Sequence, residues 1–321
     1  MSPQSLGYLL SGCALLSFTT AILVTKKATS LMPLGLGFLI ATATNVLFAA
    51  LAFGAQMAAG RALPEWNGAA MACFAGAGVL STYLGRWFFY ESVVLWGPAK
   101  ASVFQVSNPL FTALVAWLAL GEALAASTFM GMAMAVAGLI LISVNPMQAG
   151  VQPAGSAQAS ASQADAGARG ARLWARWRSS ILVLGLGSAL AYSLGNVLRG
   201  AAIRDWNEPL LGGLLGALSG LLLHFCFMPE KRELLGRLRR APQLGLWLFA
   251  LLGAATIAGQ IFSIAAMRYV PISVTNLVTL CSPLLVIPLS RVFYKNAGKT
   301  TPDVVLGAVL TVAGVGWVLM R

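Results

Sequence analysis

The chain has 321 residues, of which 58% are hydrophobic and 9% are charged, and its formal net charge is +12. A mean hydropathy of +0.80 excludes a water-soluble globular protein, in which about 25% of residues are charged. The cations cluster between apolar runs, so they indicate orientation in a membrane rather than binding to nucleic acid, and the four cysteines stand singly, without the spacing of a metal site or a cofactor motif.

Ten apolar runs follow one another along the chain, each bounded by charges, prolines or polar clusters. They cover residues 5–25, 33–57, 68–90, 98–120, 127–145, 180–200, 209–228, 243–267, 271–294 and 303–320. A helix that spans the hydrocarbon needs roughly 20 mostly apolar residues, and unpaired backbone groups are too costly there for isolated strands. We therefore predict an all-α polytopic membrane protein with ten transmembrane helices.

Two polar stretches interrupt the runs. Residues 146–179 are rich in Ala, Gly, Ser, Gln and Pro and end in a basic, Trp-containing segment, which predicts a disordered basic linker. Its basic end either contacts lipid headgroups or is simply solvated. The second stretch, 230–242, is also basic and can form one or two interfacial helical turns with Leu234, Leu235 and Leu238 toward lipid.

The distribution of cations predicts the orientation. If the amino terminus is outside, fifteen of the 21 Lys and Arg residues fall on the side of the linker, five on the other side, and Arg86 within a run. The five are Arg61, Arg199, Arg204, Arg268 and Arg321. Because cytoplasmic connections carry the excess of cations, we expect both termini outside and the linker in the cytoplasm, in a protein of the inner (plasma) membrane.

The two halves of the chain repeat each other. At an offset of 174 residues the third run aligns with the eighth and the fourth with the ninth, which pairs Gly85 with Gly259 and Asn108-Pro109 with Ser282-Pro283. The fifth run aligns with the tenth after a slip of two residues. An odd number of spans per half means that the second copy enters the membrane in the opposite sense.

This repeat predicts the domain organisation. Residues 1–145 form a first five-helix repeat, 146–179 the linker and 180–321 a second, inverted five-helix repeat. In proteins of this kind a central cavity near the membrane midplane holds the substrate where the halves meet. Rocking of one half against the other then gives alternating access.

Stretches 87–144 and 265–320 carry a family resemblance. Their shared features are the segment AMRYVPIS (266–273), the proline of the fourth helix in each half, a Gly-Glu pair that closes it in the first half, and two glycines in the fifth helix. They resemble the two EamA-type repeats of the drug/metabolite transporter superfamily, although the second half has Lys295-Asn296 in place of Gly-Glu. The resemblance implies ten helices around a central cavity and export or exchange of small metabolites.

Polar side chains inside the runs need a reason to be there, because hydrocarbon does not solvate them. Those on the predicted inward faces are our candidate substrate-binding residues. They are Tyr83, Arg86, Tyr90, Gln105, Asn108, Tyr192, Asn196, Gln260, Asn276 and Ser282. Tyr83, Arg86 and Tyr90 of the third run lie on one helical face, because they stand at positions i, i+3 and i+7. In the sixth run, Arg199 lies on the same face as Tyr192 and Asn196.

Each candidate has a structural alternative. Arg86 can bind a carboxylate or phosphate through both arms of its guanidinium, or pair with Glu91 about one turn away. Asn108 and Asn276 can contact a ligand or simply join helices by hydrogen bonds. His224 is the only histidine and has no carboxylate nearby in the sequence, so a proton relay is disfavoured.

Small residues form faces on the fifth and tenth runs. These residues are Gly131, Ala135 and Gly138 in the first half, and Gly307, Thr311 and Gly314 in the second. Small faces let helix backbones approach closely. They either hold each half together or support a homodimer.

The features together favour a secondary transporter rather than an enzyme. No nucleotide-binding G-x-x-x-x-G-K-[ST] loop occurs in the sequence. The cationic candidates favour solutes that carry a carboxylate or a phosphate, and the family resemblance implies small metabolites such as amino acids, exported or exchanged. The alternatives are a flippase for lipid or lipid-linked sugar and a membrane-embedded lipid-modifying enzyme, of which the second would need clustered carboxylates, histidines or a nucleophile.

Overall fold

The computed structural model describes residues 2–32, 34–89, 107–121, 125–144, 181–227, 234–282, 284–286, 289 and 302–319. Within these ranges the regular structure is helical, and each predicted apolar run contains a helix. The elements are α1 (Pro3–Thr29), α2 (Leu34–Ala58), α3 (Gly68–Ala77), η1 (Gly78–Gly85), α6 (Asn108–Leu120), α7 (Ala126–Val144), α9 (Ile181–Asp205), α10 (Pro209–Phe227), α11 (Leu234–Arg240), α12 (Gln243–Ala266), α13 (Ile272–Leu280) and α15 (Pro302–Leu319).

Local chemistry explains several helix ends. The Ser2 hydroxyl accepts a hydrogen bond from the Ser5 amide at the start of α1, and the Asn67 side chain does the same for Ala70 at the start of α3. Gly121 ends α6 in the left-handed conformation, with φ 64°, which a glycine adopts without a steric penalty. α15 begins at Pro302, where a missing amide hydrogen is tolerated.

Among the described residues, five helices combine the length and the hydropathy that crossing a bilayer requires. They are Pro3–Thr29, Gly35–Ala58, Gly68–Phe89, Pro209–Phe227 and Gln243–Ala266. α9 is as long, at 25 residues, or about 37 Å at 1.5 Å per residue, but it carries more polar side chains. Ser188, Ser193 and Arg199 of this helix are buried against its neighbours, so α9 is an inner helix of the bundle.

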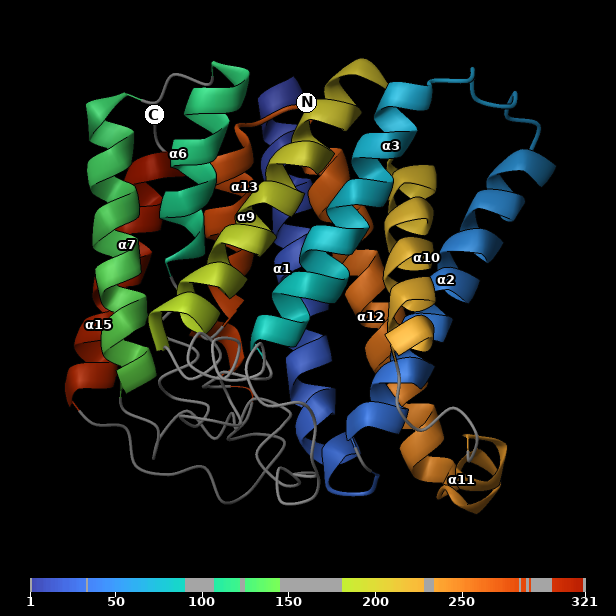
Figure 1. The fold of residues 1–321 in the computed structure, drawn as a ribbon. Helices are drawn as coiled ribbons and strands as arrows, with labels where there is room; N and C mark the ends of the chain where they lie inside the picture. Colours follow the sequence, from blue (N-terminus) through green and yellow to red (C-terminus); the bar gives the residue numbers. More distant parts are fainter. Residues whose placement is uncertain are drawn as a thin grey trace, which may run out of the picture.

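The helices of the two halves pack in a symmetric pattern. The contact of α1 with α12 corresponds to the contact of α9 with α3 and η1. The contact of α2 with α12 corresponds to that of α10 with α3. The contact of α6 with α9 corresponds to that of α13 with α1. Three pairs join a helix to its own counterpart: α2 to α10, α6 to α13, and α7 to α15. α1 and α9 run in opposite directions, and α1 begins on the side of the bundle where α15 ends (Figure 1). The arrangement is that of two inverted repeats.

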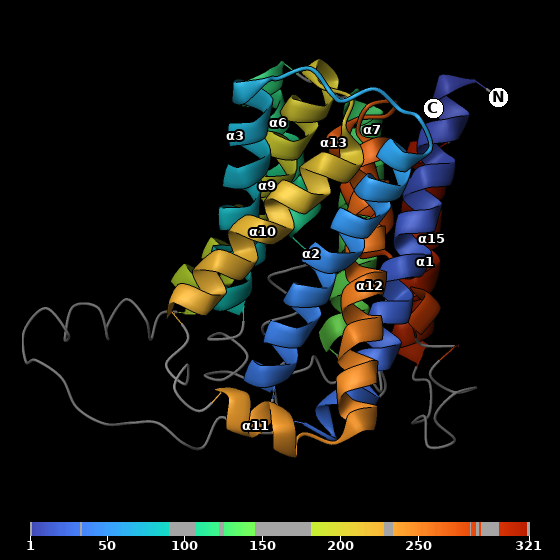
Figure 2. The same cartoon turned by 90° about the vertical axis from the view of Figure 1, so that its right-hand side faces the viewer.

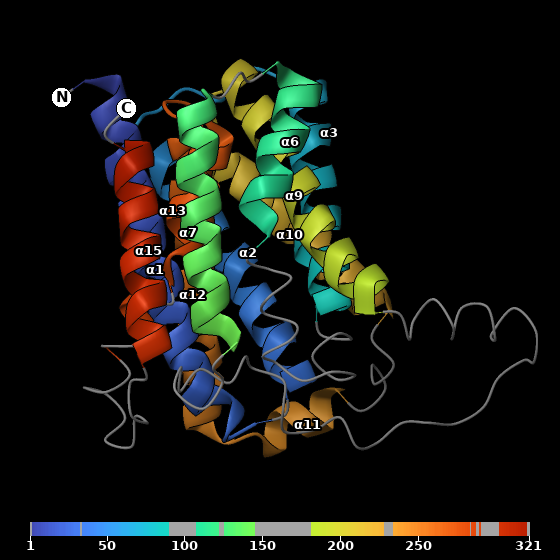
Figure 3. The same cartoon turned by 90° about the vertical axis from the view of Figure 1, so that its left-hand side faces the viewer.

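α7 and α15, one from each half, lie side by side (Figure 3), and their small residues face each other. A Cβ atom on Gly138 would overlap the carbonyl oxygen of Gly307, and one on Gly314 would lie 2.5 Å from that of Gly131. The prediction that these faces hold each half together is therefore wrong, because their partner belongs to the other half. Being covered within the chain, they are also not the surface on which a homodimer forms.

The basic stretch after α10 does form a short helix, α11, at the end of the bundle opposite the amino terminus (Figure 2). Its Leu234 and Leu238 pack against a buried cluster that includes Met32, Leu36 and Phe249. The prediction that these leucines face lipid is thus wrong, because the ends of α1, α2 and α12 offer them an apolar surface.

Candidate substrate-binding site

A buried asparagine joins three helices at the interface of the halves. The Asn276 side chain of α13 donates hydrogen bonds to Asn108 Oδ1 at 2.7 Å and to Thr112 Oγ1 at 2.8 Å, both on α6. Its own oxygen accepts a hydrogen bond from Asn196 Nδ2 of α9 at 3.1 Å. Three of the candidate residues are therefore brought together, with every polar atom of the Asn276 side chain engaged.

The start of α6 places its two polar residues toward α13. Asn108 precedes Pro109 at the beginning of the helix, and Thr112 follows one turn later on the same face. The Thr112 hydroxyl lies 3.0 Å from Asn108 Oδ1, and the Ser193 hydroxyl of α9 lies 3.1 Å from both the backbone and the side-chain oxygen of Asn108. Asn108 therefore serves as the shared acceptor of the cluster.

Arg199 continues this network into the first half. It is 6% exposed, and it donates from Nη1 to Asn196 Oδ1 at 3.1 Å and from Nη2 to Ser81 Oγ of η1. Both partners of Arg199 are uncharged. The ion pair found in the described part of the chain joins Arg61 to Glu208 and does not involve Arg199. An arginine within a membrane helix is costly, so the burial of Arg199 makes it a candidate functional residue.

The position of Arg199 corrects the count of cations. The count of cations in the sequence assigns Arg199 to the outer side, because it stands at the expected end of the sixth apolar run. α9 instead continues to Asp205, so Arg199 lies inside the bundle. The outer side keeps four of the five cations assigned to it, and the orientation stays a prediction.

The third helix is not a regular α-helix at the site. Residues Gly78–Gly85 form a π-helix, η1, in which backbone bonds join residues i and i+5. The Gly85 carbonyl accepts a hydrogen bond from the Ser188 hydroxyl of α9 at 2.8 Å, and the ring of Tyr192 packs against Gly85. Wide turns of this kind are frequent at functional sites, and here one holds Ser81 against Arg199.

Arg86 faces α2 and α10. Its guanidinium carbon lies 4.4 Å from the centroid of the Phe38 ring, a cation–π distance, and the Phe38 ring meets His224 edge-on with the centroids 4.6 Å apart. Tyr83 stacks on Phe227 at 5.7 Å. The structure thus places the only histidine beside Arg86, a proximity that the sequence does not reveal.

The remaining candidates are less closely connected. Ser282 is buried at the end of α13, and Gln260 is half-buried on α12, but within the described ranges no hydrogen bond links either to the network. Tyr90 and Gln105 lie outside the described residues. A hollow of about 430 Å³ lies elsewhere, over α2 and α12 and lined in part by Trp247, so the central cavity stays a prediction.

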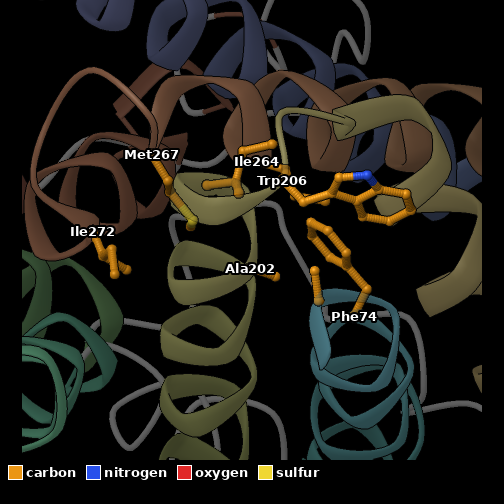
Figure 4. Close-up of a cluster of buried hydrophobic side chains, with 8 residues drawn as sticks. Phe74, Ala202, Trp206, Ile264, Met267 and Ile272 are labelled. Carbon is orange, nitrogen blue, oxygen red and sulfur yellow. The ribbon is translucent and has the colours of Figure 1, made fainter. Parts of the chain in front are cut away.

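A cluster of buried apolar side chains from both halves packs near the network (Figure 4). Phe74 of α3 packs with Ile203 and Trp206 of α9 and with Met267 and Ile272 from the second half. Ile203 follows Arg199 by about one turn, and Ile272 precedes Asn276 by one turn. Both halves therefore contribute buried apolar side chains within about one turn of the polar network.

Comparison with known proteins identifies the family. A model of the EamA-like transporter family matches residues 5–144 and again residues 179–320. The chain belongs to the EamA-like transporter family. The two matches start 174 residues apart, which is the offset at which the apolar runs align. As an EamA-like transporter, the chain is a multi-pass membrane protein that acts on small solutes.

A solved structure supports the fold of this EamA-like transporter. One described as "Crystal structure of protein" matches with a TM-score of 0.66 and 17% sequence identity, over 98% of this chain and 96% of the other. At that identity the likeness concerns the fold alone. No curated protein matches the sequence.

Four residues of the network are not among the substrate-binding candidates predicted from the sequence. They are Ser81, Thr112, Ser193 and Arg199. Arg199 had a signal, because it shares a helical face with Asn196, but it was assigned to a connection. The three hydroxyls had none, since serine and threonine in membrane helices commonly bond to their own backbone, as Thr20 does with Leu16.

Proposed function

We propose that this chain is a secondary transporter that moves small carboxylate-bearing solutes, such as amino acids, across the inner membrane by alternating access. The observation that carries the proposal is the buried network of Asn108, Asn196, Asn276 and Arg199, which joins helices of both repeats. Amide, hydroxyl and guanidinium groups offer donors and acceptors that a solute's polar groups can exchange with. Tyr83, Arg86, Tyr90, Gln105, Tyr192, Gln260 and Ser282 complete the proposed site.

Alternating access follows from the symmetry of the packing. The apolar cluster around Phe74 and Trp206 lies near the network and would separate when solute enters or leaves on that side. Because the contacts of α1, α2 and α6 with the other half have counterparts in those of α9, α10 and α13, contacts of the same kind can close the opposite side. We propose ten spans, both termini outside and the 146–179 linker in the cytoplasm, and, as the family resemblance suggests, export or exchange of the solute.

Transport is tested directly in proteoliposomes. Purified protein is reconstituted, and uptake of a panel of labelled amino acids and other carboxylates is measured with and without the same unlabelled solute inside. We expect saturable uptake of at least one solute that is accelerated by internal solute. Lipid scrambling without any solute flux would instead support the flippase alternative and reject the proposal.

A substitution in the network tests whether the solute flux depends on it. Asn276→Leu removes three hydrogen bonds without a large change in volume, and we expect the flux to fall by at least tenfold, which corresponds to about 1.4 kcal/mol. Thr20→Val is the control, because Thr20 is exposed and its hydroxyl bonds to its own helix. Equal flux in the two variants would show that solute does not pass the network.

A further inference from the structure

The short helix α11 lies at the edge of the membrane-spanning part of the bundle. It ends at Arg240, and α12, which is apolar and long enough to cross a bilayer, begins at Gln243. These two residues are therefore at most about 11 Å apart. Figure 2 shows α11 lying across the end of the bundle instead of continuing α12, which places α11 at the level of the lipid headgroups.

The apolar face of α11 is used within the protein. Leu234 and Leu238, one turn apart, pack against the buried cluster formed by the ends of α1, α2 and α12. Arg237, Arg239 and Arg240 are exposed. An interfacial helix that anchors itself in lipid buries its apolar face in the bilayer, whereas α11 is held by the protein and presents its arginines outward.

The stretch that contains α11 is positively charged. Residues 230–240 contain five Lys or Arg residues and two Glu residues, so the net charge is positive with both carboxylates counted. The two Glu residues, with Lys231 and Arg232, lie outside the described residues. Each cation at this level raises the affinity for an anionic membrane surface about fivefold.

An apolar hollow adjoins α11. Its volume is about 430 Å³, within the range of about 300 to 1,000 Å³ that is typical of ligand sites. The residues that line it are Ile40, Gln243, Leu246, Trp247 and Ala250. Ile40 and Leu246 also pack against the cluster on which the α11 leucines rest, so the hollow and α11 share one apolar base.

The lipid-facing side of α12 contains the hollow. Leu244, Trp247 and Leu251 stand at i, i+3 and i+7 on one face of this helix, and all three are exposed, Trp247 by 74%. Tryptophan is enriched where the hydrocarbon meets the headgroups, and Trp247 stands one turn into α12. An acyl chain that leaves a headgroup at α11 therefore enters the bilayer beside Trp247.

We infer that α11 and this hollow together bind one anionic phospholipid, with the headgroup on Arg239 and Arg240 and an acyl chain in the hollow. Guanidinium groups bind phosphate oxygens in pairs, and the Gln243 amide can donate to the ester oxygens between headgroup and chain. A free phosphate would use the arginines alone. The site is separate from the buried asparagine network and does not depend on the proposed transport function.

The inference is tested by lipid binding to the purified full-length protein. Melting temperatures are measured in detergent with graded mole fractions of phosphatidylglycerol, of phosphatidylcholine with the same acyl chains, or with inorganic phosphate at constant ionic strength. We expect phosphatidylglycerol to raise the melting temperature at a mole fraction at least tenfold lower than phosphatidylcholine, and phosphate to have no effect. Equal effects of the two lipids, or an equal effect of phosphate, overturn the inference.

A double variant assigns the headgroup to α11. Arg239→Gln combined with Arg240→Gln should raise the half-saturating mole fraction of phosphatidylglycerol at least tenfold, because two cations of about fivefold each are lost. Arg204→Gln is the matched control, since it removes an exposed arginine from the last turn of α9, which ends at the other end of the bundle (Figure 1). Wild-type lipid binding by the double variant contradicts the inference.

A second variant assigns the acyl chain to the hollow. Ala250→Phe places a ring in the hollow and keeps both arginines, so we expect the half-saturating mole fraction of phosphatidylglycerol to rise several-fold. Leu251→Phe is the control, because Leu251 is exposed beside the hollow without lining it. If Ala250→Phe binds phosphatidylglycerol as tightly as Leu251→Phe does, the chain does not lie in the hollow and the inference fails.

Discussion

At the scale of single residues, the site depends on amides that bond across the two halves. Asn276 uses both of its amide hydrogens on α6 and its oxygen on α9, so its geometry is fixed from two sides. In membranes such bonds contribute about 0.6 kcal/mol on average and about 1.7 kcal/mol at most. A chain of them therefore specifies the arrangement more than it stabilises the fold, and polar groups of a solute can compete with it.

The substitution Thr112→Val tests whether one hydrogen bond of the network affects solute flux as well as stability. The change keeps the shape of the side chain and removes the hydroxyl that accepts from Asn276 at 2.8 Å. We expect a loss of about 0.6 to 1.7 kcal/mol in stability and a several-fold loss of solute flux. Melting of the purified protein and counterflow measure the two effects, with Thr20→Val as the control, and a loss of stability without any loss of flux would assign Thr112 a purely structural role.

The sequence predicts part of this network for a clear reason. Asn108, Asn196 and Asn276 are conspicuous because amides are costly in hydrocarbon, and the structure brings all three together. Arg199 was misplaced because the apolar run ends five residues before the helix does. His224 and Arg86 meet only through Phe38 of another helix, and one-dimensional spacing carries no information on such a contact.

At the scale of elements, η1 and α10 make the closest backbone contact near the site. A Cβ atom on Gly78 would overlap the backbone of Gly216, so only glycine fits at this crossing. Regular helices are what the apolar pattern predicts, and a π-turn in one of them depends on how its neighbours pack. The wide turn over Gly78–Gly85 therefore could not be predicted from the sequence.

Gly78→Ala tests the crossing. The added methyl group must push η1 away from α10, and we expect a loss of about 1 to 3 kcal/mol in stability together with a loss of flux, because Ser81 moves away from Arg199. Gly76→Ala is the control in the same helix: its nearest neighbour would be Leu198 Cδ1 at 3.5 Å, which is an ordinary contact. If the two variants have equally low melting temperatures, then any added methyl group on this helix destabilises the protein.

At the scale of the whole molecule, the account depends on two repeats inserted in opposite directions. The offset of 174 residues predicts the repeat from the sequence, and the family match supports it. Which helices pair could not be predicted in the same way: the glycine faces of α7 and α15 fit within one half as well as between halves. The structure pairs them across the halves, which makes α7 and α15 part of the interface between the repeats.

The most direct test of the inverted repeat is the sidedness of three positions. In a variant without the four natural cysteines, single substitutions Ser2→Cys, Ser160→Cys and Arg321→Cys are exposed to a membrane-impermeant maleimide on intact and on permeabilised cells. The account predicts labelling of Ser2→Cys and Arg321→Cys in intact cells, and of Ser160→Cys, within the 146–179 linker, only after permeabilisation. Labelling of Ser160→Cys and Arg321→Cys from the same face would contradict it, because an odd number of spans could not separate them.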